Sequence, residues 1–158
     1  MVRYLALEGR NELLVSLDEV VFEMVQRLSV ARERSELGRV FGGFAESLQL
    51  ADEDRIRWRI PFCHHPPYSA GPRHHNTNDM HPLIARLAAA RVRAMFSGHE
   101  HNFQHSHVGG IDYFVTGAAG KLRRGRPNAF ETAHTVSWSD TPHFLLVTID
   151  GTRMTVRA

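Results

Sequence analysis

Histidine is concentrated in one part of this 158-residue sequence: nine of its 11 histidines lie between His64 and His107. Two groups in this stretch have a spacing that could do chemistry, one in FCHHPPYS (62–69) and one in GHEH (98–101). Neutral imidazole is the commonest metal ligand in proteins, and it can also act as an acid or a base near neutral pH. The clustering therefore indicates metal binding, acid–base chemistry or both.

The first histidine group stands where a predicted strand must end. The alternating segment 56–60 continues to residue 63, and Pro66-Pro67 follow the two histidines. Proline lacks an N–H group and biases the preceding residue towards extended backbone, so the strand stops here. His64 and His65 are left at its carboxyl end, which is where ligands usually bind in α/β folds.

The second group contains two histidines one residue apart, His99 and His101. On extended backbone both side chains point to the same side, so they can serve one metal ion or two adjacent ones. A loop over 69–79, a helix from about 80 to 91 and a strand over 92–96 separate the two groups. This order predicts a crossover unit with two parallel strands. If the strands are neighbours, both groups open on one edge of the sheet.

Other elements of the predicted fold are helices and strands that pack around this unit. Strands are expected at 2–7, 111–116, 144–149 and 153–156, the last two joined by a hairpin turn at Asp150-Gly151. Apolar spacing predicts packing helices at about 18–34 and 35–50. Residues 121–142 show no convincing periodicity and are interpreted as a long loop.

Composition indicates one folded domain over 1–158, since 42% of the residues are hydrophobic and 23% are charged. No apolar run approaches the roughly 20 residues that cross a bilayer, and the first residues lack the pattern of a signal peptide. We therefore expect no membrane partner, and the cytoplasm is the default location.

Cys63 is the sole cysteine in the sequence, which excludes an internal disulfide. A nucleophilic role beside His64 is an alternative, but a small apolar residue closing a buried strand is the favoured interpretation. The formal net charge is +2. The basic stretch KLRRGR (121–126) raises nucleic-acid binding as a further alternative, which the lack of interleaved aromatic residues disfavours.

Three segments, FCHHPPYSAG, MFSGHEHNFQH and YFVTGAAG, together resemble the carboxyl-terminal motifs of calcineurin-like metallophosphoesterases, specifically the purple acid phosphatase-like branch. The resemblance extends over 2–158 and is densest over 57–120. It implies an α/β fold, a β-sandwich of mixed sheets flanked by helices, of which this chain holds the second half. It also implies hydrolysis of phosphate esters at a centre of two divalent or trivalent metal ions, Fe, Zn or Mn.

The resemblance assigns metal ligands residue by residue. His64 corresponds to a ligand of one metal ion, and His99 corresponds to a second ligand of that same ion. His101 corresponds to a ligand of the other ion. Asn102 and Gln104 are interpreted as residues that orient these histidines.

Substrate contacts and the catalytic acid are expected in the segment that follows the first motif. The family has a histidine about nine residues beyond the first ligand, and here that offset falls on Arg73. With a one-residue insertion His74 takes the catalytic role, slightly favoured over His75, and Arg73 can hold phosphate. His65, at the variable position of the motif, is a candidate for touching substrate.

Motifs from the amino-terminal half of the family are absent from the sequence. It contains no GD or GN dipeptide and no D-x-H near its start, so the bridging Asp and the Asn ligand have no counterpart. A complete dinuclear centre is therefore not expected from this chain alone, and at most partial metal occupancy is predicted. An amino-terminal half supplied by another chain would complete it. The alternative is a noncatalytic metal- or phosphate-binding remnant or subunit.

Overall fold

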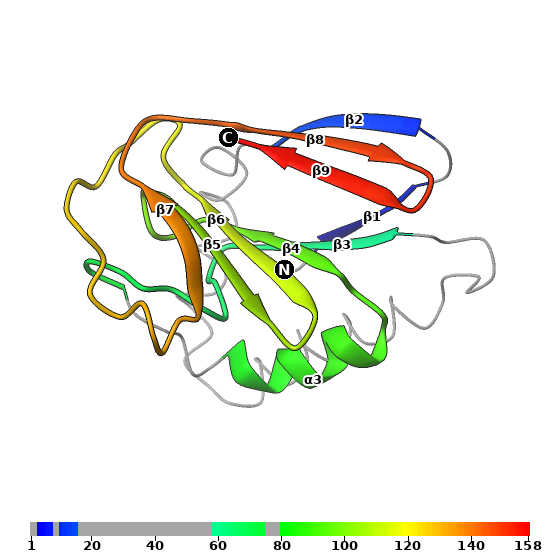
Figure 1. Cartoon of the computed structure of the whole chain (residues 1–158), viewed down its shortest axis with the longest axis horizontal. Helices are drawn as coiled ribbons and strands as arrows, with labels where there is room; N and C mark the ends of the chain where they lie inside the picture. The colour runs from blue at the N-terminus through cyan, green and yellow to red at the C-terminus, as the bar shows by residue number, and fades with distance from the viewer. Residues whose placement is uncertain (1–2, 8–9, 16–57, 75–79) are drawn as a thin grey trace.

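The computed structural model describes residues 3–7, 10–15, 58–74 and 80–158, and Figure 1 shows their arrangement. They form nine strands and one helix. In chain order these are β1 (Arg3–Leu7), β2 (Arg10–Val15), β3 (Trp58–Cys63), α3 (His81–Ala89), β4 (Ala94–Ser97), β5 (Phe103–Val108), β6 (Ile111–Thr116), β7 (Thr135–Ser139), β8 (Leu145–Asp150) and β9 (Arg153–Arg157).

The larger sheet is mixed and has six strands in the order β1-β3-β4-β6-β5-β7. Its centre is parallel, because β3 pairs with β4 and β4 pairs with β6 in the same direction. The other pairs are antiparallel. The predicted crossover from β3 through α3 to β4 is confirmed, and its two strands are direct neighbours.

The smaller sheet has three antiparallel strands in the order β2-β8-β9. Its hairpin turns at Asp150 and Gly151, as the sequence predicts, and the positive φ of 55° at Gly151 explains why glycine stands there. Since this sheet is wholly antiparallel, the expectation that both sheets are mixed is wrong for the smaller one. The pairing of β2 with β8 is a long-range contact that local sequence does not reveal.

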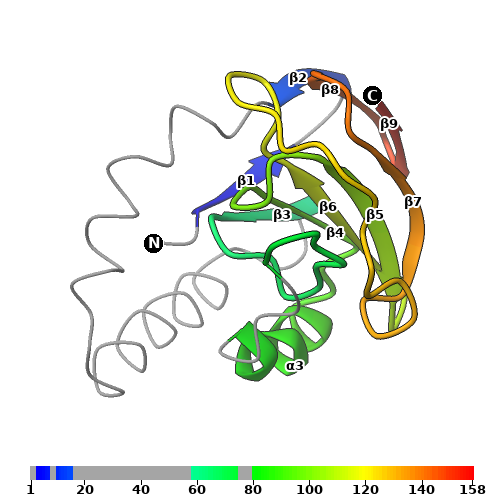
Figure 2. The same cartoon turned by 90° about the vertical axis from the view of Figure 1, so that its left-hand side faces the viewer.

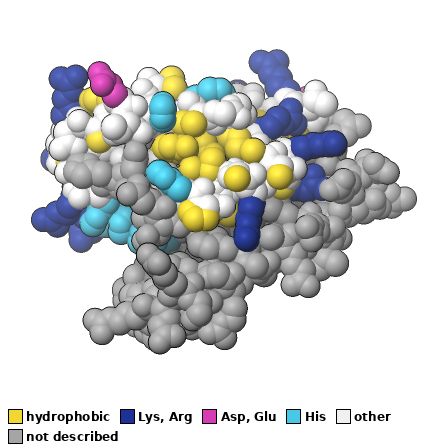
Figure 3. Space-filling view, turned by 90° about the horizontal axis from the view of Figure 1, so that it is seen from below, with side chains coloured by type: hydrophobic (Ala, Val, Ile, Leu, Met, Phe, Trp, Pro, Cys, Tyr) yellow, Lys and Arg dark blue, Asp and Glu magenta, His cyan; other side chains and the backbone are white. Residues whose placement is uncertain are grey.

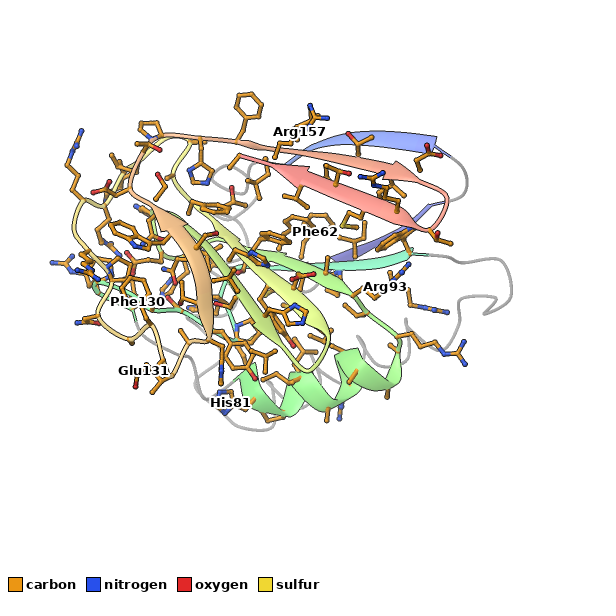
Figure 4. All side chains as sticks on the ribbon, viewed as in Figure 1. Phe62, His81, Arg93, Phe130, Glu131 and Arg157 are labelled. Atoms are coloured by element: carbon orange, nitrogen blue, oxygen red, sulfur yellow. The ribbon has the colours of Figure 1, made fainter. Side chains whose placement is uncertain are left out.

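Apolar side chains from both sheets form a common core between them. Trp58, Phe96 and Phe114 from the larger sheet pack with Leu145, Val147 and Ile149 from β8, and all six are buried. Partly buried Phe62 packs against this core, and Figure 4 shows it between the two sheets. The two sheets therefore form a sandwich, as expected.

The opposite face of the larger sheet is covered by α3. Leu83 and Leu87, four residues apart on one side of the helix, are fully buried against Met95 and Tyr113 of the sheet. Pro82 stands in the first turn of the helix, where its missing N–H costs nothing. The described part of the chain is thus layered as sheet, sheet and helix (Figures 1 and 2).

Some strands of the structure differ from the prediction. No strand is expected at β2 or β5, and β7 lies inside the segment interpreted as a loop, where it pairs with β5 at the edge of the sheet. The helices expected at 18–34 and 35–50 lie outside the described residues. Among the described residues, no helix has the length and apolar character needed to cross a membrane.

Candidate metal centre

The two histidine groups meet because β3 and β4 are parallel neighbours. Their last residues, Cys63 and Ser97, are paired across the sheet, so the segments that follow leave from the same edge. The backbone N–H of Gly98 then donates to the carbonyl of His64 at 3.1 Å. Figure 2 shows the molecule from the end at which both strands finish. The carboxyl end of the parallel strands therefore carries both motifs, as expected for a ligand site in such a sheet.

Three imidazoles form a group that could hold one metal ion. Ligand nitrogens of His64, His65 and His99 all lie within 4.8 Å of one another. His64 Nε2 and His99 Nδ1 are 3.0 Å apart, and the ring centroid of His65 is 4.3 Å from that of His99. The buried Nδ1 of His64 has no hydrogen-bond partner among the described residues. Three nitrogen ligands match the number of protein ligands in catalytic zinc sites.

Burial and neighbouring charges keep the imidazoles of His64 and His99 neutral. Burial of His64, followed by repulsion from His65, His101 and His74, lowers its pKa from 6.5 to about 4. Burial and the nearby imidazoles, together with Arg123, lower the pKa of His99 from 6.5 to about 3. A metal ion binds the neutral form of histidine. Both side chains are therefore in the form that coordinates metal throughout the neutral pH range.

The turn that carries His99 is strained and closely packed. His99 has a φ of +68°, a left-handed conformation that is costly for residues other than glycine. GHEH is therefore not extended here, and the premise that extended backbone aims both histidines to one side is wrong. Gly117 lies against the turn: a Cβ on it would come 2.6 Å from the carbonyl oxygen of Glu100. Glycine at 117 lets the two backbones approach.

A buried carboxylate ties the loops around the centre together. Glu100 is fully buried, and its Oε1 accepts a hydrogen bond from Nη1 of Arg123 at 2.9 Å. Its Oε2 accepts one from the backbone N–H of His74, also at 2.9 Å. This contact places the His74 ring centroid 4.1 Å from that of His99. Glu100 thus connects three chain segments beside the histidines.

A second buried pair supports the loop that begins at residue 69. Gln104 Oε1 accepts a hydrogen bond from the backbone N–H of Ala70 at 2.7 Å, and Gln104 Nε2 donates to Oδ1 of Asn102 at 3.0 Å. Both side chains are fully buried. The expectation that they orient the site is consistent with these contacts, which hold the loop against the GHEH turn.

Similar folds occur among solved structures. The chain matches GAP50, the anchor in the inner membrane complex of Plasmodium, with a TM-score of 0.69 and 14% identity, over 93% of this chain and 48% of that chain. It also matches purple acid phosphatase PPD1 from yellow lupin seeds, with a TM-score of 0.59 and 14% identity, over 74% of this chain and 25% of that chain. No protein-family model and no curated protein matches the sequence.

The chain has the metallophosphoesterase fold. It spans about half of the first of these proteins and a quarter of the second. The resemblance drawn from the three sequence motifs is thus supported at the level of the fold, over most of the chain.

Within this metallophosphoesterase fold, the predicted ligands His64 and His99 are in direct contact. His65, expected to lie near substrate, completes the three-histidine group. His101 is half-buried and outside that group, close enough to His64 to influence its pKa, so its assignment to another metal ion stays a prediction. Figure 3 shows histidine side chains gathered towards one side of the molecule.

Residues expected to bind substrate or donate a proton lie at the margin of the group. The His74 ring contacts the ring of His99, whereas Arg73 is exposed. His75 lies outside the described residues. Sequence reasoning gave Glu100 no role within GHEH and treated Arg123 only as part of the basic stretch, because the contact that joins them spans 23 residues.

The remaining candidates have structural roles. Cys63 is buried, its Sγ donates to the His65 carbonyl at 2.9 Å, and burial raises the pKa of its thiol far above the usual range. This favours the packing interpretation over the nucleophile. His105 and His107 lie on β5, which pairs with β6, and each is 2.8 Å from Oδ1 of Asp112.

Proposed function

We propose that this chain carries out metal-dependent hydrolysis of phosphate esters, with a metal ion held by His64, His65 and His99. The observation that supports the proposal is the grouping of these three imidazoles at the carboxyl end of β3 and β4 in a metallophosphoesterase fold. Imidazole ligands suit zinc and iron. Fold likeness alone does not specify a reaction, so the proposal depends on this site.

The chemistry that a metal ion supplies in such a site is Lewis-acid activation of water and of the phosphoryl group. The protein's residues supply the rest. His74, held beside His99 through its backbone contact with Glu100, is proposed to give a proton to the leaving oxygen, and its contact with the His99 ring supports this role. His75 keeps its place as the alternative acid, and Arg73 at the exposed margin is proposed to meet the substrate phosphate.

A dinuclear centre is the finer form of this proposal. His101 would serve a second metal ion, and the remaining carboxylate and amide ligands would come from an amino-terminal half on another chain. Support comes from the sequence, which contains no GD or GN dipeptide. Fusion to an amino-terminal half from the family tests this form: a soluble, metal-loaded protein without phosphoesterase activity would contradict it.

A noncatalytic role is the second candidate. The structure matched over 93% of this chain is that of GAP50, the anchor in the inner membrane complex of Plasmodium. In this reading the histidines, with Arg73, bind metal or phosphate without hydrolysis. Unchanged phosphate affinity in a His64→Ala and His99→Ala double variant would argue against it.

The deciding experiment measures metal content and hydrolysis together. The purified chain is loaded with zinc or manganese, desalted and analysed for metal, and its hydrolysis of a chromogenic phosphate monoester is followed. We expect about one bound ion per chain, lost in His64→Ala and in His99→Ala. His107→Gln serves as the matched control, since it removes a histidine outside the group. Metal-loaded protein with no hydrolytic activity favours the noncatalytic role. A chain that binds no metal contradicts both metal-dependent hydrolysis and noncatalytic metal binding.

A further inference from the structure

Arg123 belongs to the basic stretch 121–126 but, unlike its exposed neighbour Arg124, is turned into the site. Its backbone N–H donates to the carbonyl of His101 at 2.8 Å, and its Nη1 donates to Glu100 Oε1 at 2.9 Å. The side chain is 20% exposed, whereas that of Glu100 is fully buried. Arg123 thus reaches from solvent to the inside of the histidine turn.

The guanidinium of Arg123 lies close to the candidate metal ligands. Its positive charge is among the causes that lower the pKa of His99, which places the two groups within electrostatic reach. A guanidinium carries five N–H donors in a planar fork. Among the described residues, the side chain of Arg123 is paired with Glu100 through one guanidinium nitrogen, Nη1. Donors remain for an anion that approaches the histidines.

Burial of Glu100 explains how Arg123 is fixed. A buried carboxylate is costly unless it is paired and hydrogen-bonded. Here one oxygen is paired with Arg123 and the other accepts the backbone N–H of His74. One side chain therefore sets the positions of the arginine and of the loop that carries the proposed acid. Both lie beside His99.

We propose that Arg123 binds phosphate oxygens of the substrate at the histidine centre and that Glu100 is the residue that positions it. The ligand class is a phosphate ester, with a monoester as the substrate tested, because a planar guanidinium binds two phosphate oxygens at once. The neighbouring imidazoles add no negative charge, and the Glu100 carboxylate engages one guanidinium nitrogen. This inference rests on the proposed function, although phosphate binding by Arg123 does not require catalysis.

Inorganic phosphate is the probe for a test by titration calorimetry, with the zinc-loaded full chain and with the metal-free chain. Arg123→Gln should weaken phosphate binding by about tenfold or more while metal content stays unchanged. Arg123→Lys should fall between, because it keeps the charge and loses the planar fork. Arg124→Gln is the control, because it removes the same charge from the exposed residue that follows Arg123. It should change phosphate affinity by less than about twofold.

Outcomes separate this inference from the proposed function. If Arg123→Gln binds phosphate as tightly as wild type, or wild type binds none, the inference is overturned whatever the hydrolytic activity. If phosphate binds through Arg123 but the metal-loaded chain hydrolyses no ester, the inference stands and the hydrolase proposal fails. Bound phosphate is also observed directly by its ³¹P resonance.

Glu100 is tested by its coupling to Arg123. Glu100→Gln keeps the shape of the side chain, and we expect it to weaken phosphate binding and to raise KM for a monoester more than it lowers kcat. In the Arg123→Gln background the same change should have no further effect on phosphate affinity, because positioning acts through the arginine. Equal effects in both backgrounds would show that Glu100 is merely structural. If Glu100→Gln does not fold, the arginine variants still decide the assignment of Arg123.

Discussion

His64 Nε2 lies 3.0 Å from His99 Nδ1, although the two residues are 35 positions apart in the chain. Both imidazoles are held in the neutral form, with the pKa of His64 lowered to about 4 and that of His99 to about 3. Such a pair can share one proton in an N–H···N contact or coordinate a common cation. The neutral imidazoles can therefore coordinate a metal ion, and the free energy of unfolding is expected to fall in acid, where imidazole is protonated in the unfolded chain.

Acid sensitivity of the metal-free chain follows from these two pKa values. Between about 6.5 and about 4 the unfolded chain binds more protons at His64 and His99 than the folded chain, so the free energy of unfolding falls as the pH falls. Urea unfolding in the presence of a chelator measures this. The double variant His64→Gln and His99→Gln should show a shallower decline across this range, and an equally steep decline would contradict the assignment.

Sequence reasoning located the centre because it depends on local signals. Prolines after His65 end β3, the turn residues over 69–74 form a loop, and Leu83 and Leu87 define the covering helix. These features require a parallel crossover, and the crossover brings the two motifs to one edge. The position of the histidines could therefore be predicted before any contact was known.

Features that depend on contacts between distant segments could not be predicted in the same way. β7 has the sequence TVSWS, in which three of five residues are partly buried and two are exposed, so it carries no strong apolar alternation. β7 is a strand because it pairs with β5, a contact between distant segments. Likewise, the sequence shows Arg123 only as part of a basic stretch. In the structure it is paired with Glu100, which lies 23 residues earlier.

Backbone strain at His99 gives a second prediction. Its φ of +68° is accessible to glycine at little cost, whereas a side chain pays about 1 kcal/mol. His99→Gly should therefore be more stable than His99→Ala by about 1 kcal/mol in chemical unfolding, while both lose metal. Equal stability of the two variants would show that the left-handed conformation is not maintained in solution.

Close packing at Gly117 gives a third. An added Cβ would meet the carbonyl oxygen of Glu100 at 2.6 Å and Cα of Gly98 at 3.4 Å, both backbone atoms of the histidine turn. Gly117→Ala should displace that turn, cost about 1–3 kcal/mol of stability and weaken metal binding. Ala119→Ser, at an exposed position nearby, is the control. Unchanged zinc affinity and unfolding midpoint in Gly117→Ala would contradict the prediction.

The junction of the two sheets at Trp58 gives the last prediction. Trp58 is buried in the common core, its Nε1 donates to the carbonyl of Gly151 at 2.8 Å, and the guanidinium of Arg93 lies 3.7 Å from its ring centroid. The first contact joins β3 of the larger sheet to the hairpin of the smaller one.

Trp58→Phe removes this hydrogen bond and part of the core volume, so the free energy of unfolding should fall by about 2–3 kcal/mol. Arg93→Gln should cost about 0.5–1 kcal/mol in wild type and less in the Trp58→Phe background, where the ring face is smaller. Phe144→Leu is the control, because Phe144 is 54% exposed. If Trp58→Phe changes stability no more than Phe144→Leu does, the sheets are not joined through Trp58. We expect Trp58→Phe to keep its metal content while its stability falls, because Trp58 begins β3 and His64 follows the other end of that strand.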